Sequence, residues 1–142
     1  MQKVSVIVVN WNRREMLRLC LQSLERQSHT PLEIIVVDNG SADGSVDLIK
    51  QNFPTVSLIE NVRNLGFCEA NNQGIAAAQG NMIALLNNDA EADPHWLETL
   101  GAVFEGHPEV GMAASKILVH GDPGRIDKAG HLIFLDGQNR GR

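Results

Sequence analysis

Short apolar runs alternate with amphipathic stretches along the first 105 residues of the chain. The apolar runs are rich in branched side chains and too brief for core helices, which indicates strands buried on both faces. Strands are expected at residues 4–9, 32–37, 56–59 and 82–86. The amphipathic stretches between and after them predict helices that follow Asn12, cover residues 45–51 and 66–79, and begin near Pro94.

This alternation of strands and helices predicts an α/β fold, with a mostly parallel sheet and helices on both of its faces. Such sheets bind ligands beyond the carboxyl ends of their strands, so polar residues should gather directly after the strands. They do so after all four runs: Asn10 and Asn12, Asp38 and Asn39, Asn61 and Asn64, and Asn87, Asn88 and Asp89.

The pattern loosens after about residue 105. We divide the chain into an α/β core of residues 1–105 and the beginning of a second region, residues 106–142. In the second region a strand is expected within residues 110–119. A Gly- and Pro-containing turn at 121–124 and one or two short strands within 126–135 should follow.

Composition narrows the class of protein. Hydrophobic residues make up 43% of the chain and charged residues 20%, as in folded globular domains. A formal charge of -5 without a Lys/Arg run disfavours nucleic-acid binding. The first apolar run is too short for a signal peptide or a membrane span. The two cysteines and five histidines form neither a disulfide framework nor a paired zinc motif.

The Asn-Asn-Asp segment after the fourth expected strand is the strongest candidate for chemistry. Asp89 offers a carboxylate to a hard cation such as Mg²⁺, which usually takes one or two carboxylates together with substrate phosphates. Asn87 and Asn88 offer amides to a ribose or to an ordered water. The same residue types also cap turns well. Taken alone, the segment is equally compatible with a turn before the helix that begins near Pro94.

The segment after the second strand, residues 38–45, is a second candidate. Asp38 offers an acceptor to a nucleoside, and Gly40 permits close approach of the backbone. An Asn-Gly pair is also common in turns, and Ser41 or Asp43 can cap the next helix. Taken alone, this segment favours the turn. Asn12, followed three residues later by Glu15, similarly predicts a helix cap.

A third candidate is the amide-rich start of the helix expected at residues 66–79. Asparagine is a poor helix former, so Asn71 and Asn72 are predicted to line a polar pocket. Gly66 would expose backbone N–H groups to an anion at the helix start. A capped helix with a solvated face is the alternative, and it explains Asn64 but not the Asn71 and Asn72 pair.

The ordered segments 4–12, 36–45, 64–74 and 87–89 together resemble the motifs of family-2 inverting glycosyltransferases, with the rhamnosyltransferase-like branch as the nearest type. The resemblance is strong from residue 3 to about 105 and weak beyond. It implies a GT-A (Rossmann-like) fold whose C-terminal part is incomplete in this chain. It also implies an enzyme that transfers a sugar from a UDP- or dTDP-sugar to a glycan or lipid-linked acceptor with inversion.

The resemblance also assigns residues and cofactors. Asp89 matches the last carboxylate of the family's Asp-x-Asp motif, which would bind Mg²⁺ or Mn²⁺. Asn87 replaces the first acid of that motif, which predicts a weaker metal site. The location implied is cytoplasmic, with the inner membrane face as an alternative, in cell-wall or polysaccharide biosynthesis. The implied nucleotide-binding residues are Asn10, Asn12, Asp38, Asn39, Asn64, Gly66, Asn71, Asn87 and Asn88.

The transfer reaction also needs a carboxylate base to take the proton of the acceptor hydroxyl. In the family this base lies well past the metal motif. Glu91 and Asp93 lie too near that motif, and three later acids, Asp122, Asp127 and Asp136, are interpreted as loop residues. We therefore expect an N-terminal fragment that binds the donor with metal and transfers no sugar alone.

Two other classes of protein remain open. A phosphate-receiver signalling domain would need an acidic pair after the first strand, where this chain has Asn10 and Asn12. A non-catalytic nucleotide-binding or self-associating module is the stronger alternative. An exposed sheet edge would then support a homo-oligomer.

Overall fold

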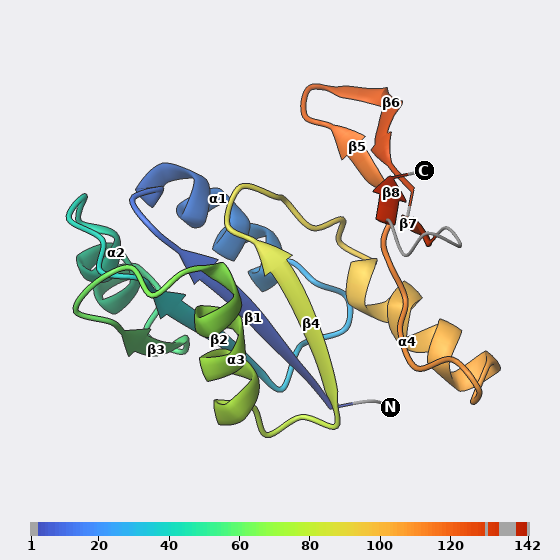
Figure 1. Cartoon of the computed structure of the whole chain (residues 1–142), viewed down its shortest axis with the longest axis horizontal. Helices are drawn as coiled ribbons and strands as arrows, with labels where there is room; N and C mark the ends of the chain where they lie inside the picture. Colours follow the sequence, from blue (N-terminus) through green and yellow to red (C-terminus); the bar gives the residue numbers. More distant parts are fainter. Residues whose placement is uncertain (1–2, 130, 134–138, 142) are drawn as a thin grey trace. The chain divides into compact units, whose positions relative to one another are not determined.

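The computed structural model of the chain describes residues 3–129, 131–133 and 139–141 (Figure 1). The chain divides into two compact units, Met1–Gly101 and Ala102–Arg142. The elements of the first unit are β1 (Val4–Asn10), α1 (Arg14–Glu25), β2 (Glu33–Asp38), α2 (Ser45–Asn52), β3 (Ser57–Glu60), α3 (Phe67–Ala77), β4 (Met82–Asn87) and the start of α4 (Trp96–Gly106).

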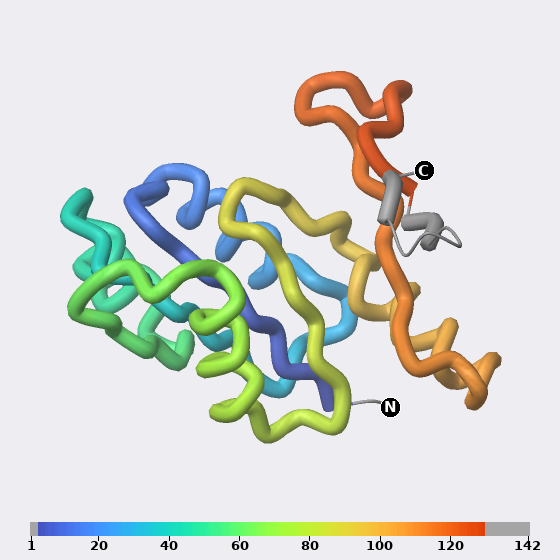
Figure 2. The backbone as a smooth tube through the Cα atoms, in the orientation of Figure 1, coloured from blue at the N-terminus to red at the C-terminus, as the bar shows by residue number. Residues whose placement is uncertain are grey.

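The four strands of the first unit form one parallel sheet in the order β3-β2-β1-β4. The register places Asn10 beside Asp38 and Val9 beside Asn87, so β1, β2 and β4 end at one edge of the sheet. Figure 2 shows the chain leaving these strands through loops on that side. The prediction of an α/β fold with a parallel sheet is confirmed for this unit.

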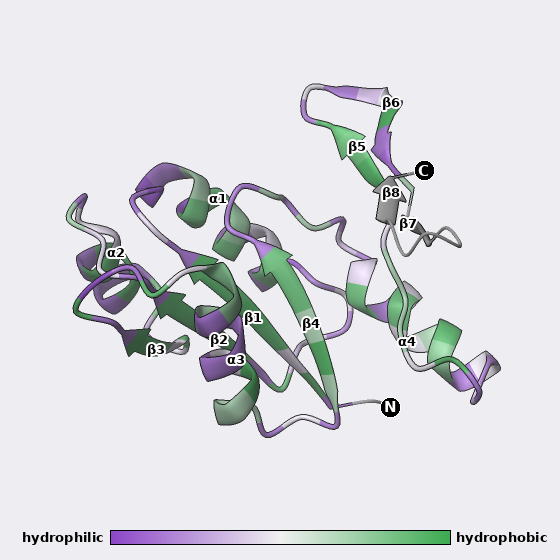
Figure 3. Ribbon diagram, in the orientation of Figure 1, coloured by the Kyte–Doolittle hydropathy of each residue, from purple (hydrophilic) through white to green (hydrophobic). Residues whose placement is uncertain are grey.

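Helices cover both faces of the sheet, as predicted (Figure 1). The larger cluster of buried side chains joins Val6, Val8 and Val36 to α1, α2 and Leu97 of α4. On the opposite face α3 packs against β1 and β2 through Ala70. In Figure 3 the strands of this sheet are mostly coloured as hydrophobic, because strands between two layers of helices are buried on both sides.

The contact between α3 and the sheet is confined to the middle of the helix. A Cβ atom on Gly74 would lie 2.5 Å from Cγ2 of Ile7, so the helix can approach β1 this closely only with glycine there. The apolar stripe expected along α3 is only half right. Ala70 and Gly74 are buried, whereas Phe67 is 62% exposed and Ala77 is exposed.

Strand β4 differs from the expectation of a fully buried strand. Ala84 is buried on the face shared with α1, but Ile83 is 40% exposed and Leu85 is 52% exposed on the other face. The reason is its position, since β4 pairs only with β1 among the described strands and α3 packs over β1 and β2 instead. This edge carries an exposed apolar surface, as the expectation of an exposed sheet edge proposed, although the pattern of the strand itself indicated burial on both faces.

The second unit contains β5 (Ile117–Val119), β6 (Asp122–Lys128), β7 (His131–Ile133) and β8 (Asn139–Gly141), which form two antiparallel pairs. Only the last part of the strand expected within 110–119 forms. The expected turn at 121–124 is wrong, because Gly121 with φ +78 makes a tighter turn and β6 starts at once. Asp122 and Asp127 therefore lie in a strand, not in loops, and Asp136 lies outside the described residues.

None of the helices in the described part of the chain is long and apolar enough to cross a membrane.

Candidate functional site

Polar side chains from the ends of three strands meet at the carboxyl edge of the sheet. Asn10, the last residue of β1, donates from Nδ2 to Oδ1 of Asp38 at the end of β2, over 2.9 Å. Asn88, directly after β4, donates from Nδ2 to Oδ1 of Asn10 over 2.8 Å. These bonds confirm that the polar residues after the strands gather at one edge.

Both oxygens of the Asp38 carboxylate accept hydrogen bonds from other groups of the protein. Oδ1 accepts from Asn10 and, over 2.7 Å, from the hydroxyl of Ser41, while Oδ2 accepts from the Ser41 N–H over 2.8 Å. The side chain is 1% exposed. In this structure Asp38 therefore closes the turn after β2, as the turn interpretation proposed, and its contact with a nucleoside stays a prediction.

Asn12 joins the same loop but does not cap a helix. Its backbone adopts a positive φ of 51°, and its Oδ1 accepts from the N–H of Ala42 over 2.8 Å. The expected capping pair of Asn12 and Glu15 is wrong. Helix α1 begins at Arg14, whose N–H donates to the Asp43 carboxylate over 2.8 Å, and Glu15 pairs with Arg18 instead.

Asp43 holds the starts of two helices. One carboxylate oxygen accepts from the N–H of Arg14 in α1, and the other accepts from the N–H and hydroxyl of Ser45 in α2. Partial burial works to raise the pKa of this carboxyl, but the hydrogen bonds from Ser45 and Arg14 outweigh burial and lower the pKa below 3.8. The prediction that Ser41 or Asp43 caps the second helix is wrong, because the N-cap of α2 is Gly44, which has no side-chain cap bond; Asp43 instead accepts from Ser45, the first residue of the helix.

Because folding lowers the pKa of Asp43, its contribution to stability is present above its ordinary pKa and is lost as pH falls through the lower folded value. Asp43→Asn is expected to lower the melting temperature at pH 7, and this deficit should shrink below about pH 4. Thermal unfolding followed by circular dichroism from pH 7 to pH 3 measures it. Asp47→Asn, an exposed acid in the first turn of α2, is the control. A deficit independent of pH would contradict this role.

A second network clamps the loop between β3 and α3. The buried Asn39 donates from Nδ2 to Oδ1 of Asn64 and to the carbonyl of Gly66, each over 3.2 Å. Its Oδ1 accepts from Asn61 over 2.9 Å, and Asn61 bonds in turn to Gln73. The Asn39 N–H donates to the carbonyl of Asn10, so the two networks are continuous.

Two residues that were expected to face a ligand donate hydrogen bonds to other groups of the protein. The N–H of Gly66 donates to Oδ1 of Asn64 over 2.8 Å, so it is not a free donor for an anion in this structure. The buried Asn71 donates from Nδ2 to the carbonyl of Phe67, one helical turn earlier, over 2.8 Å. Asn71 thus bonds within the first turns of α3, its neighbour Asn72 is exposed, and the role of this pair in a polar pocket stays a prediction.

The Asn-Asn-Asp segment divides into different environments. Asn88 is half-buried in the network, whereas Asn87 and Asp89 are exposed. The carbonyl of Asn87 accepts from the N–H of Ala90 over 3.1 Å, which turns the chain back after β4. Burial, followed by the nearby charges of Asp89 and Glu91, raises the pKa of the Cys20 thiol to about 12, so these carboxylates lie near Cys20 at the end of β4.

The metal implied by the resemblance fits this segment in one way only. Among residues 3–129, 131–133 and 139–141 no three His, Cys, Asp or Glu side chains are grouped closely enough to hold a metal ion. Asp89 offers one exposed carboxylate. That donor set fits a Mg²⁺ or Mn²⁺ ion whose other ligands are a diphosphate and water, and it does not fit a cation held by the protein alone.

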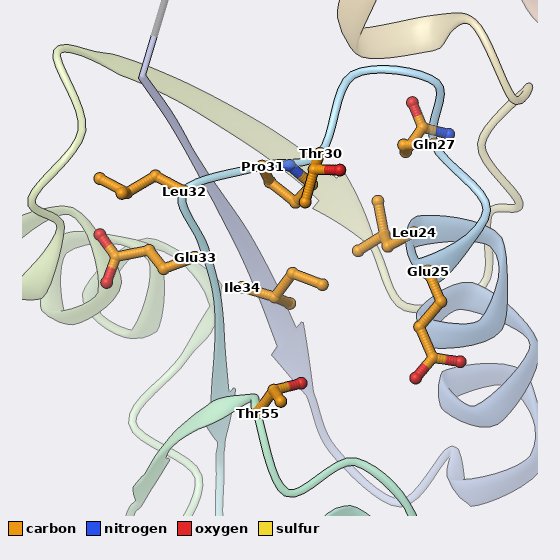
Figure 4. A pocket seen from close by; sticks show the side chains of 9 residues that line it. All are labelled: Leu24, Glu25, Gln27, Thr30, Pro31, Leu32, Glu33, Ile34 and Thr55. Carbon is orange, nitrogen blue, oxygen red and sulfur yellow. The ribbon is translucent and has the colours of Figure 1, made fainter.

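A pocket of about 360 Å³ lies at the opposite end of β2 from Asp38 (Figure 4). It is formed by the end of α1, the loop into β2 and Thr55, with Leu24, Glu25, Gln27, Thr30, Pro31, Leu32, Glu33 and Ile34 as the other lining residues. None of the residues predicted to bind a nucleotide or metal lines it. The candidate site is therefore the open edge at the carboxyl ends of the strands.

Sequence reasoning missed several members of this site. Ser41, expected only as a helix cap, joins Asn10, Asn12 and Asp38 through its hydroxyl. No local sequence pattern predicts the role of Gln73, because its hydrogen-bond partner Asn61 lies on the loop before α3. Trp11, between Asn10 and Asn12, is 51% exposed beside the polar network, and this exposed aromatic residue in the site motif was a signal that could have been used.

A parallel sheet with helices on both faces, and with ordered polar loops at the carboxyl ends of its strands, defines an open α/β protein of the type that binds ligands at this edge. The chain belongs to glycosyl transferase family 2, whose family model matches residues 5–140. This membership excludes the phosphate-receiver alternative.

A curated relative and two solved structures illustrate the similarity. The Escherichia coli K12 protein described as uncharacterized glycosyltransferase YibD is 40% identical over 101 residues, which are 69% of this chain and 29% of that protein. Staphylococcus aureus TarS 1-349 in complex with UDP matches with a TM-score of 0.69 and 20% identity, over 82% of this chain and 41% of that one.

The mannosyltransferase PcManGT from Pyrobaculum calidifontis, in complex with GDP-Man and Mn²⁺, matches with a TM-score of 0.68 and 23% identity, over 87% of this chain and 37% of that one. These neighbours establish the GT-A fold. The chain thus spans less than half the length of each of these three proteins.

Proposed function

We propose that this chain forms the donor site of a glycosyltransferase that uses a nucleotide-diphosphate sugar. The observation that carries the proposal is the exposed Asp89, placed directly after a network that joins the ends of β1, β2 and β4. The nucleotide would lie across this edge, and Asp89 would hold Mg²⁺ or Mn²⁺ against its diphosphate. The solved neighbours that contain UDP, or GDP-Man with Mn²⁺, support this arrangement.

The residues of the site divide into two roles under this proposal. Asn10, Asp38, Asn39 and Asn64 form a fixed frame, because their polar atoms are bonded to one another before any ligand arrives. A second group is exposed at the same edge and can contact the donor: Trp11, Asn87, Asp89 and Asn12, whose Oδ1 is already bonded to Ala42. An ordered frame lowers the cost of placing the ligand, because less side-chain and loop freedom is lost on binding.

The proposed reaction transfers the sugar with inversion. A hydroxyl of a glycan or lipid-linked acceptor attacks the anomeric carbon and loses its proton to a base, while the bond from that carbon to the diphosphate oxygen breaks. A divalent cation bound at Asp89 would neutralise charge on the leaving diphosphate. Through that cation Asp89 would position the diphosphate, and the exposed Asn87 amide would donate to a hydroxyl of the donor.

We assign the base and the acceptor site to the whole protein, because this chain covers less than half the length of the relatives it matches. The 142-residue chain is then expected to bind the donor and to transfer no sugar alone. The likeness of its motifs to the rhamnosyltransferase-like branch makes dTDP-sugars, beside UDP-sugars, the donors to test.

Calorimetric titration of the folded chain with UDP, dTDP and their sugar conjugates tests donor binding. Heat is expected with at least one nucleotide in the presence of Mn²⁺ or Mg²⁺. Binding should be weaker without the metal, and the metal alone should bind weakly, since the protein contributes one carboxylate. Absence of heat with every donor would refute donor binding. Efficient sugar transfer by the 142-residue chain would refute only the assignment of the base and the acceptor site to the whole protein.

A further inference from the structure

We propose that Ser23 of α1 and Gln27, just beyond the end of that helix, are positioning residues that hold the loop bearing Asp89 ready for the metal-bound diphosphate. This inference rests on the proposed donor site. Neither residue lies among the polar positions after the strands. Both are buried, and both bond to the backbone of the segment that follows β4.

The two sides of Asp89 are each tied to α1. Before Asp89, the carbonyl of Asn87 accepts from the Cys20 thiol over 3.5 Å. After it, the N–H of Ala92 donates to the hydroxyl oxygen of Ser23 over 2.9 Å. Cys20 and Ser23 are three residues apart and so lie on one face of the helix. The Asp89 turn is therefore held at both of its ends by one rigid element.

The Ser23 hydroxyl is fixed as well as buried. It is 1% exposed, and it donates over 2.6 Å to the carbonyl of Cys20 one turn earlier in α1. With its hydrogen engaged there, the oxygen can act toward Ala92 only as an acceptor. The hydroxyl thus joins the two anchors and sets where the chain emerges from the Asp89 turn.

Gln27 continues the same attachment beyond Ala92. Its Nε2 donates to the carbonyl of Asp93 over 2.7 Å, and its Oε1 accepts from the N–H of Leu97 over 3.0 Å. The N–H of Ser28 donates to the carbonyl of Pro94 over 2.8 Å. One amide side chain therefore fixes both the end of the loop and the first turn of α4.

This attachment matters for the metal because the protein contributes a single carboxylate. An exposed turn with one ligand would sample many positions, and ordering it on binding would reduce affinity. Partners that orient a metal ligand from behind typically account for about 10- to 100-fold in metal affinity. Ser23 and Gln27 act from behind Asp89 through the loop backbone, without touching the donor.

Ser5 provides a matched control at the other end of the sheet. It is also a fully buried serine, with its hydroxyl donating to Glu33 over 2.6 Å and accepting from the N–H of Gly80 over 2.8 Å. Ser5→Ala and Ser23→Ala each remove two hydrogen bonds from a buried hydroxyl. A purely structural loss should therefore be similar in the two variants, and only Ser23→Ala should alter the Asp89 turn.

The test measures UDP affinity of the 142-residue chain with and without Mn²⁺, and hydrogen exchange of residues 88–93, in wild type and three variants. Ser5→Ala and Ser23→Ala should lower the melting temperature comparably. Only Ser23→Ala should reduce the Mn²⁺-induced gain in UDP affinity, by about tenfold, and speed exchange in residues 88–93. Gln27→Met, which keeps side-chain length but loses both hydrogen-bonding atoms, should do the same and is the second variant in case Ser23→Ala does not fold.

Equal Mn²⁺-induced gains in Ser5→Ala and the folded Ser23 or Gln27 variants would overturn the positioning role and leave the proposed function intact. A wild-type chain whose UDP affinity does not respond to Mn²⁺ would overturn the metal role of Asp89 itself and this inference with it.

Discussion

Asp89→Asn is expected to abolish the gain in nucleotide affinity that Mn²⁺ or Mg²⁺ provides. The protein offers the cation a single carboxylate, so the amide leaves the diphosphate and water as its only strong ligands. A bound cation stabilises the diphosphate by several kcal/mol through charge neutralisation. Losing part of this energy should lower the nucleotide affinity in the presence of the metal by about a hundredfold. Metal-free affinity should be nearly unchanged. Calorimetric titration with UDP, with and without Mn²⁺, measures both quantities.

Glu91→Gln is the matched control for Asp89→Asn, because it removes an equal charge two residues away. Its Mn²⁺-induced gain should stay near the wild-type value. If Asp89→Asn kept the full gain while Glu91→Gln lost it, the metal would be bound through Glu91 and the assignment from the motif would be wrong.

Asp38→Ala is expected to destabilise the chain by about 3 kcal/mol. The change leaves the Ser41 N–H and the Asn10 amide without their acceptor in a buried place, and each buried donor left unpaired costs about 1–3 kcal/mol. Urea unfolding measures the loss. Asp47→Ala, at an exposed carboxylate of α2, should change stability little.

The same variant separates the two interpretations of Asp38. If Asp38 acts as part of the frame, the free energy of unfolding of Asp38→Ala should fall. Its nucleotide affinity should then fall only because the loops of the site become less ordered. An Asp38→Ala chain with wild-type stability but no UDP binding would instead place the carboxylate in direct contact with the nucleoside.

The strands could be predicted because their apolar runs leave little choice. Val6 and Val8 of β1 are buried on one face of the sheet and Ile7 on the other, so an unbroken short apolar run predicts a strand covered on both faces. Residues 117–128 were harder. There the left-handed conformation of Gly121 determines where a short hairpin turns, and the pattern of apolar residues does not predict that conformation.

The site was predictable in place but not in detail. Parallel strands bring Asn10, Asp38 and Asn88 to one edge, and topology alone requires this. Whether an amide meets a ligand or a neighbouring loop depends on contacts between residues distant in sequence. Asn39 with Asn64 and Ser23 with Ala92 are such pairs, and no local spacing reveals them.

A crystal structure of the chain with UDP and Mn²⁺ tests the central claim most directly. We expect a diphosphate lying over the carboxyl ends of β1 and β4, with Mn²⁺ bound by an Asp89 oxygen and by phosphate oxygens. The frame bonds of Asn10 and Asp38 should be preserved. A nucleotide bound elsewhere, such as the pocket beside Thr30, or a Mn²⁺ ion without Asp89 among its ligands, would contradict it.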